Sequence, residues 1–134
     1  EHLICTEQLS RRLGFKVGEE LVRVVRVRSL NGSARQVDHG YFLASIAKGL
    51  TPEIAADSIY GYLEHKRGIK VMASRRTVSV ELANDEDCSY LDLGKYNCVA
   101  VMESQSYTSD GILFEVTHAR THPEIFHYRV NSKR

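Results

Sequence analysis

Residues 21–28 read Leu-Val-Arg-Val-Val-Arg-Val-Arg, a run rich in β-branched side chains that predicts a β-strand. Successive side chains of a strand point to opposite faces, so Arg26 and Arg28 emerge on the same face, roughly 7 Å apart. Two guanidinium groups at this distance repel each other. They suit either a solvated strand face or a pocket that binds an anion such as phosphate or carboxylate. The strand by itself leaves both alternatives open.

A tight hairpin turn follows this strand. Asn31-Gly32 supplies the two residues of positive φ that a two-residue hairpin turn prefers. The residues beyond the turn, from about 34 to 43, form the predicted return strand. The first firm unit of the fold is therefore an antiparallel hairpin.

Short helices and further strands fill the rest of the chain. Thr51-Pro52 is a helix-start signal and predicts a short helix over 54–56. A second signal at Asp57-Ser58 predicts a helix that runs to residue 67, and residues 84–87 predict a helix that runs to residue 93. Alternating apolar residues predict strands at 77–82, 98–107, 112–119 and 126–130, and residues 4–9 allow a short edge strand with a turn of helix. Six strands with mostly hairpin connections predict an α+β domain: a six-stranded antiparallel sheet with short helical inserts.

Length and composition favour one globular domain. The chain has 134 residues, 43% of them hydrophobic, and a formal net charge of +1. This charge makes the domain a poor partner for nucleic acid on its own, and the apolar runs are too short to span a membrane. The chain has three cysteines, an odd number that cannot all pair in disulfides within the chain, which favours reduced thiols over a disulfide framework. Because the chain starts without methionine, we expect it to be a fragment of a longer protein.

A second candidate for anion binding is the predicted helix start at Ser58 and Tyr60. The first turn of a helix offers free backbone N–H groups and the positive end of the helix dipole. If this turn faces Arg26 and Arg28, guanidiniums, hydroxyls and amides can hold one phosphate together. The alternative is a plain helix cap at Ser58 and a core aromatic ring at Tyr60.

Two carboxylates add to this candidate site. Asp38 lies on the return strand, and Glu115 shares a strand face with Leu113. An acid near the arginine pair can accept hydrogen bonds from ligand hydroxyls or amines, or it can simply neutralise the arginines. Spacing alone does not choose between these roles.

Signatures of catalysis and of metal binding are missing. The sequence has no glycine-rich phosphate loop, no G-x-S-x-G elbow and no H-E-x-x-H motif. His118, His122 and His127 lie near one another in sequence with Glu124, but their spacing fits neither a helix nor a zinc finger. We therefore predict no metal, no cofactor and no enzymatic activity.

The order of these motifs resembles a known family. The run V-R-V-R-S-L-N-G, then Asp38 to Tyr41, Ser58-Ile59-Tyr60 with Leu63, Leu91-x-Leu93-Gly94 and Leu113-Phe114-Glu115 are similar to the effector-binding (UTRA) domain of GntR-type transcriptional regulators of the HutC subfamily. That domain shares its fold with chorismate lyase. The resemblance covers residues 13–130.

The resemblance implies a cytoplasmic bacterial transcription regulator, most often a repressor, whose N-terminal winged helix-turn-helix DNA-binding domain is absent from this chain. It also implies a homodimer. In relatives that sense sugar phosphates, the positions of Arg26, Arg28, Ser58 and Tyr60 hold the phosphate. In the same relatives, acids at the positions of Asp38 and Glu115 hold sugar hydroxyls.

Three departures from the family pattern concern the non-anionic part of the ligand. Relatives commonly carry proline near Ala34 and glutamate, one methylene longer, at Asp38. Where relatives often read Tyr-Arg-Gly-Asp, this chain has Thr121-His122-Pro123-Glu124.

Two alternative functions remain: an enzyme of the chorismate-lyase type, and a dimerisation module that binds no ligand.

Overall fold

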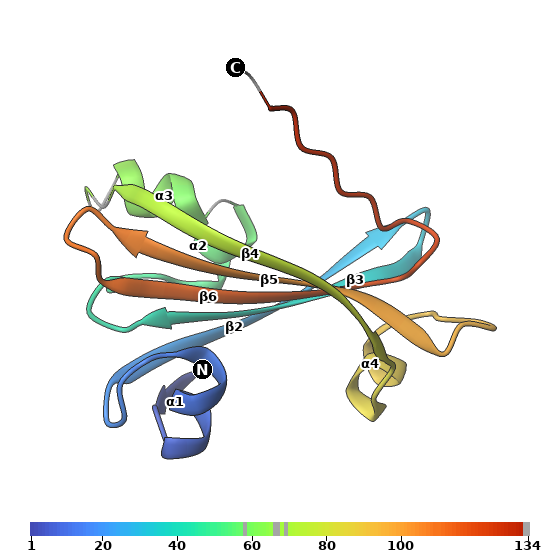
Figure 1. The fold of residues 1–134 in the computed structure, drawn as a ribbon, viewed down its shortest axis with the longest axis horizontal. Helices are drawn as coiled ribbons and strands as arrows, with labels where there is room; N and C mark the ends of the chain where they lie inside the picture. The colour runs from blue at the N-terminus through green and yellow to red at the C-terminus, as the bar shows by residue number, and fades with distance from the viewer. Residues whose placement is uncertain (58, 66–67, 69, 133–134) are drawn as a thin grey trace.

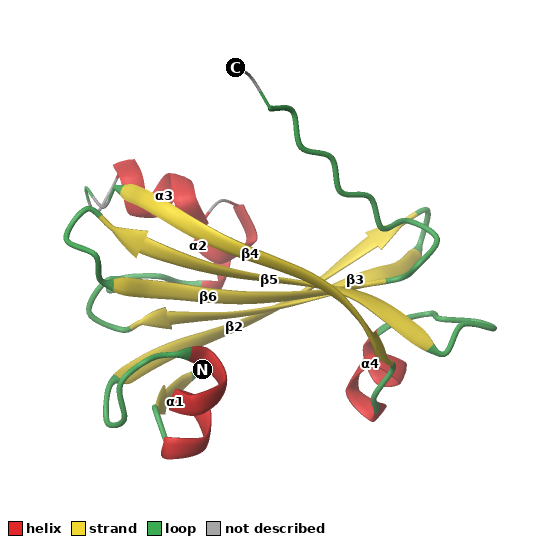
Figure 2. Cartoon of the chain, viewed as in Figure 1, coloured by secondary structure: helices red, strands yellow, loops and turns green. Residues whose placement is uncertain are grey.

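A single antiparallel sheet organises the fold (Figures 1 and 2). The computed structural model describes residues 1–57, 59–65, 68 and 70–132. The strands are β1 His2–Ile4, β2 Glu20–Leu30, β3 Ser33–Leu43, β4 Val71–Leu82, β5 Cys98–Thr108 and β6 Leu113–Thr121. The helices of the described residues are α1 Glu7–Leu13, α2 Pro52–Asp57, α3 Ile59–His65 and α4 Asp85–Tyr90. The strand order across the sheet is β1-β2-β3-β6-β5-β4.

The predicted hairpin is confirmed. β2 and β3 pair in antiparallel fashion with Arg26 opposite Asp38. Asn31 and Gly32 have φ values of 52° and 82°, as the two-residue turn requires. The predicted α+β class and the six-stranded antiparallel sheet are confirmed as well.

One predicted strand is wrong. Residues 126–130 form no strand, and the sixth strand is β1, which pairs with β2. The backbone N–H groups of Ile125 and Phe126 donate to the carbonyl of His122 in a turn. This turn directs the C-terminal segment away from the sheet (Figure 1). Since β6 is already flanked by β3 and β5, no free edge is available to the segment there.

Three element boundaries also differ from the prediction. β4 begins at Val71 rather than at residue 77, because its first half is an edge strand that carries no apolar alternation. α1 is a full helix, capped by Thr6, whose side chain accepts from the N–H of Leu9. α4 ends at Tyr90, where Leu91 adopts an extended conformation.

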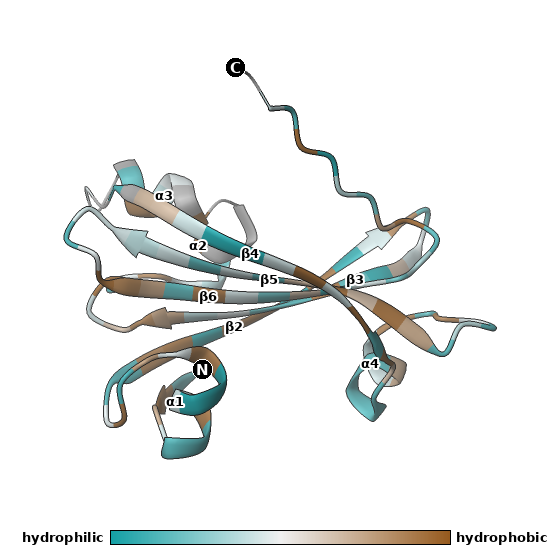
Figure 3. Ribbon diagram, in the orientation of Figure 1, coloured by the Kyte–Doolittle hydropathy of each residue, from teal (hydrophilic) through white to brown (hydrophobic). Residues whose placement is uncertain are grey.

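Apolar side chains gather toward the two ends of the sheet. At one end, α1 covers one face and α2 and α3 cover the other, and the shared core includes Leu13, Phe15, Leu21, Phe42, Leu63 and Phe114. At the other end, the segment that follows α4 contributes Leu91 and Leu93 to a smaller core with Val37, Val99 and Val101. Figure 3 shows apolar segments of β6 and β5 toward opposite ends, with polar segments between them. The middle of the sheet is thus left to polar side chains.

None of the helices in the described residues has the length and apolar character needed to cross a bilayer.

Candidate functional site

A trough on one face of the sheet collects four of the six side chains that the sequence singles out. Arg26, Arg28, Asp38 and Glu115 all line this cavity of about 370 Å³. Its other lining residues are Val24, Gln36, Gly40, Phe42, Ile59, Arg76, Ser104, Thr117 and Ala119. Residues in register on neighbouring strands share a face, which explains why side chains so distant in sequence converge.

Asp38 holds the arginine pair together. The Nε of Arg28 donates to Asp38 Oδ2 at 3.0 Å, and a terminal nitrogen of Arg26 lies 3.9 Å from the same oxygen. The Asp38 side chain is only 6% exposed, whereas the Arg28 side chain is 60% exposed. Both arginines therefore lie next to one buried carboxylate, and both line the trough.

Neighbouring polar groups orient both carboxylates of the trough. The side-chain amide of Gln36 donates to Asp38 Oδ1 at 2.6 Å. The Thr117 hydroxyl donates to Glu115 Oε1 at 2.9 Å, and Glu115 is almost completely buried. An ionised carboxylate has about four acceptor positions. Both carboxylates line the trough, where their oxygens are of the kind that accepts from a ligand hydroxyl or amine.

The predicted helix start is only partly described. Ser58 lies outside the described residues, and Tyr60 lies in α3, but its side chain is outside them too. Ile59, between these two residues, is buried and lines the trough. The backbone at the start of α3 is thus next to the trough, while the contacts of Ser58 and Tyr60 with a phosphate stay a prediction.

Sequence reasoning missed four polar residues of the trough. Gln36 and Thr117 lie two residues from Asp38 and Glu115 on the same strands, so strict alternation could have found them. Arg76 and Ser104 come from β4 and β5. Their approach depends on the strand order, which local sequence patterns do not reveal.

The three C-terminal histidines do not come together as a site. His118 lies on β6, 3.8 Å from a Glu103 carboxylate oxygen. His122 is buried, accepts from the N–H of Glu124 through Nδ1 and packs edge-on against the Tyr96 ring. His127 is exposed. The described residues contain no group of side chains suited to hold a metal ion.

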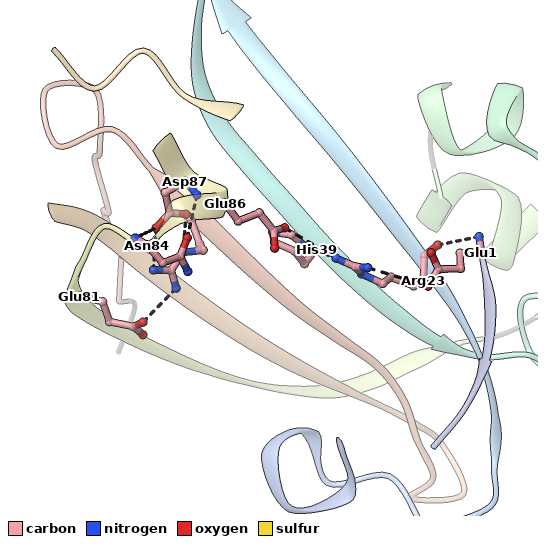
Figure 4. Close-up of polar contacts among 8 residues, drawn as sticks. Glu1, Arg23, His39, Glu81, Asn84, Glu86 and Asp87 are labelled. Atoms are coloured by element: carbon pink, nitrogen blue, oxygen red, sulfur yellow. Dashed lines mark hydrogen bonds and ion pairs between the residues drawn. The ribbon is translucent and has the colours of Figure 1, made fainter. Parts of the chain in front are cut away.

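The opposite face of the sheet carries a separate polar network (Figure 4). His39 Nε2 lies 3.1 Å from a Glu86 carboxylate oxygen, and its Nδ1 lies 3.4 Å from a terminal nitrogen of Arg23. Burial lowers the pKa of His39, Arg23 and Arg120 lower it further, and Glu86 opposes them. This network connects β2 and β3 to α4.

Arg120 ties α4 to the sheet in the same network. Its Nε and one terminal nitrogen donate to the two carboxylate oxygens of Asp87, at 2.7 and 3.0 Å. Its other terminal nitrogen donates to Glu81 at 3.0 Å. Asp87 is 1% exposed and also closes a capping box with Asn84 at the start of α4. The role of this network is therefore to attach α4 to the sheet.

Comparisons with known sequences place the chain in a protein family. The UTRA domain model matches residues 1–127. The chain is 28% identical over 123 residues to the HTH-type transcriptional regulator TreR of Bacillus subtilis (strain 168), covering 92% of this chain and 52% of that protein. It is 31% identical over 88 residues to the uncharacterized HTH-type transcriptional regulator YydK of the same strain, covering 66% and 37%. The chain thus spans about half the length, or less, of these relatives.

Solved structures match over nearly the whole chain. The effector-binding domain of the B. subtilis trehalose repressor TreR superposes with a TM-score of 0.92 and 26% identity, covering 100% of this chain and 93% of that one. The structure of YydK from B. subtilis has a TM-score of 0.87 and 25% identity, covering 99% and 58%. A GntR-family regulator from Bacillus cereus, at 23% identity and a TM-score of 0.87, shares the fold.

Proposed function

Because the chain belongs to the UTRA domain family, we propose that it is the effector-sensing domain of a bacterial transcriptional regulator that binds a phosphorylated sugar in the trough. Binding changes the DNA affinity of a helix-turn-helix domain attached to this chain. The HTH-type names of the relatives support the DNA-binding partner. A repressor of the HutC subfamily, located in the cytoplasm, is the form that the sequence resemblance favours.

The observation that carries this proposal is the convergence of two guanidinium groups on one wall of the trough. Arg26 and Arg28 both line the cavity, and both lie within ion-pair distance of the Asp38 carboxylate. Guanidinium groups match the geometry of phosphate oxygens and form charge-assisted hydrogen bonds with them. A phosphate placed at this wall of the trough would lie next to both guanidinium groups.

The rest of the trough suits a sugar. Asp38 and Glu115 offer carboxylate oxygens to hydroxyl groups, and Thr117 and Ser104 add hydroxyls of their own. A similar relative is named the trehalose repressor, which supports a sugar as the non-anionic part of the ligand. Because the similar relatives are named as transcriptional regulators, we infer a sensor rather than an enzyme.

A thermal-shift screen tests the proposal. The domain is heated with glucose 6-phosphate, glucosamine 6-phosphate and trehalose 6-phosphate, and with the three unphosphorylated sugars as matched controls. A ligand present at about 100 times its Kd stabilises the fold by about 2.7 kcal/mol. We expect at least one phosphorylated sugar to raise the melting temperature and its unphosphorylated control to leave it unchanged.

Two results oppose the proposal. Equal shifts with and without phosphate show that the arginine pair is not an anion site. Release of pyruvate from chorismate above the uncatalysed rate shows that the domain is an enzyme.

A further inference from the structure

A second cavity lies on the opposite face of the sheet from the trough. Its volume is about 490 Å³, and its walls come from α1, α4 and the strands β2, β3, β4 and β6. The helices α1 and α4 lie toward opposite ends of the sheet, so the cavity runs between them (Figure 1). The network that attaches α4 to the sheet lines only one end of this cavity.

The carboxylates that line the cavity are engaged at its α4 end. Asp87 and Glu81 accept hydrogen bonds from Arg120. Glu86 lies 3.1 Å from the Nε2 of His39. All three carboxylates come from the end of β4 or from α4, and α1 adds none to the lining.

The rest of the cavity presents nitrogen groups with few partners. Arg12 of α1 is exposed, and no carboxylate of the described residues lies within ion-pair distance of it. The Nε of Arg23 and the Nε2 of His118 are buried without a hydrogen-bond partner among the described residues. Arg23 makes only long ion pairs, at 3.7 Å to Glu86 and 3.9 Å to Glu1. Buried polar groups of this kind favour a bound group that satisfies them.

His118 is the titratable group at this end of the cavity. It lies in register between His39 on β3 and Glu103 on β5. The Glu103 carboxylate is 3.8 Å from the Nε2 of His118, which is too long for a hydrogen bond. Burial lowers the pKa of His118, and Glu103 opposes this effect. The positive charge of Arg12 lowers the pKa further.

We propose that this end of the cavity is a second binding site, for a small oxyanion held by the guanidinium of Arg12 and the protonated imidazole of His118. Both groups donate to the oxygens of a phosphate, a sulfate or a carboxylate. The site is separate from the trough, because the two cavities share no lining residue and lie on opposite faces of the sheet. The inference therefore does not depend on the proposed function.

NMR titration of the histidine signals tests this second site. The pKa of His118 is measured in the double variant Arg26→Gln/Arg28→Gln, which removes the arginine pair of the trough. Sodium sulfate, sodium acetate and sodium chloride are compared at equal ionic strength. We expect sulfate, acetate or both to raise the pKa by about one unit relative to chloride, because a bound anion favours the charged imidazole. The exposed His127 is the internal reference and responds equally to all three salts.

Two neighbouring arginines of α1 give a matched pair of variants. Arg12→Gln, added to the double variant, is expected to abolish the rise in the pKa of His118. Arg11→Gln is expected to keep it, because Arg11 pairs with Glu7 and does not line the cavity. Both arginines are exposed on α1, so both variants keep their fold, and circular dichroism verifies this.

Three results overturn the inference. An equal pKa of His118 in all three salts shows that no oxyanion binds beside it. A rise that persists in Arg12→Gln shows that Arg12 does not hold the anion. A rise that occurs in the wild type and not in the double variant places the anion in the trough.

Discussion

Asp38 is the residue on which the charge of the trough depends. Its carboxylate serves Arg28, Gln36 and the more distant Arg26, and it is itself buried. The sequence resemblance assigns it to sugar hydroxyls, and its free acceptor positions allow that role alongside the ion pairs. Asp38 is therefore a counter-ion of the two arginines, and in the proposed function it would compete with a phosphate for them.

Asp38→Asn separates these two roles. Removal of the negative charge leaves Arg26 and Arg28 with a larger net positive charge. A unit charge at about 4 Å contributes about 1 kcal/mol even in water. We expect inorganic phosphate to bind at least about fivefold more tightly to the variant, as measured by calorimetry. Weaker phosphate binding would show that Asp38 helps to position the anion instead.

His39 gives the fold a dependence on pH. Burial lowers its pKa in the folded protein, so below the ordinary value of 6.5 the unfolded chain binds the proton more readily. Stability is therefore fully present above pH 6.5 and declines as the pH falls below it. We expect urea unfolding to show a lower free energy at about pH 5.5 than at about pH 7.5, with a smaller difference in His39→Gln. The same difference in the variant would assign the effect to other groups.

The sequence predicts those trough residues that lie on one strand or one hairpin, but not those that the strand order brings together. Arg26 and Arg28 follow from alternation within one strand, and Asp38 follows from the hairpin that Asn31-Gly32 imposes. Arg76 does not follow, because its place depends on a sheet order in which β4 lies four strands from β2. Local chemistry thus predicts one wall of the site and not the other.

At the scale of elements, α4 depends on one buried ion pair. This helix has six residues, too few to be stable alone. The most buried contact of its attachment comes from Arg120 on β6, which binds both oxygens of Asp87, and Glu86 adds contacts with His39 and Arg23. The capping box of Asn84 and Asp87 uses the same carboxylate, so the helix start and the docking contact are a single structure.

Arg120→Met tests this attachment. The substitution leaves the Asp87 carboxylate buried without its cation, which costs about 3 to 5 kcal/mol in proteins. Urea unfolding is expected to show a loss of this size. Glu81→Gln removes the half-exposed partner of the same arginine, and its cost is expected to stay below about 1 kcal/mol. Equal losses in the two variants would mean that Asp87 is not the main partner.

The misplaced sixth strand shows where local patterns fail at this scale. Residues 126–130 have strand-like composition, yet the turn at His122 leads them away from the sheet. Residues 2–4 are a weaker candidate by composition, but they pair with the free edge of β2. Edge availability decided between the two segments, and it is a property of the whole sheet.

For the whole molecule, the exposed edge strand β4 favours association. It is twelve residues long, and Val78, Val80 and Leu82 are exposed on the face that also carries Arg76. A long edge strand with apolar side chains tends to pair with another chain. We propose that the domain is a homodimer, which a regulator of a two-fold symmetric operator also requires.

Light scattering tests the dimer. At micromolar concentration the wild-type domain is expected to have the mass of two chains, and Val80→Lys the mass of one, because a lysine at this exposed edge position opposes strand pairing. A wild-type monomer would contradict association through this domain. A dimer unaffected by Val80→Lys would place the interface elsewhere.

The central claim is that the arginine pair of β2 binds the phosphate of the effector. Calorimetry measures the affinity of Arg26→Gln and Arg28→Gln for a phosphorylated sugar, namely the one that gives the largest thermal shift. Arg23→Gln, on the opposite face of the strand, is the control. Loss of a charged hydrogen bond amounts to about 1.5 to 3 kcal/mol. The affinity is therefore expected to fall about tenfold or more in the first two variants and to stay unchanged in the third. Wild-type affinity in both Arg26→Gln and Arg28→Gln would contradict the account and make this face of β2 a solvated surface.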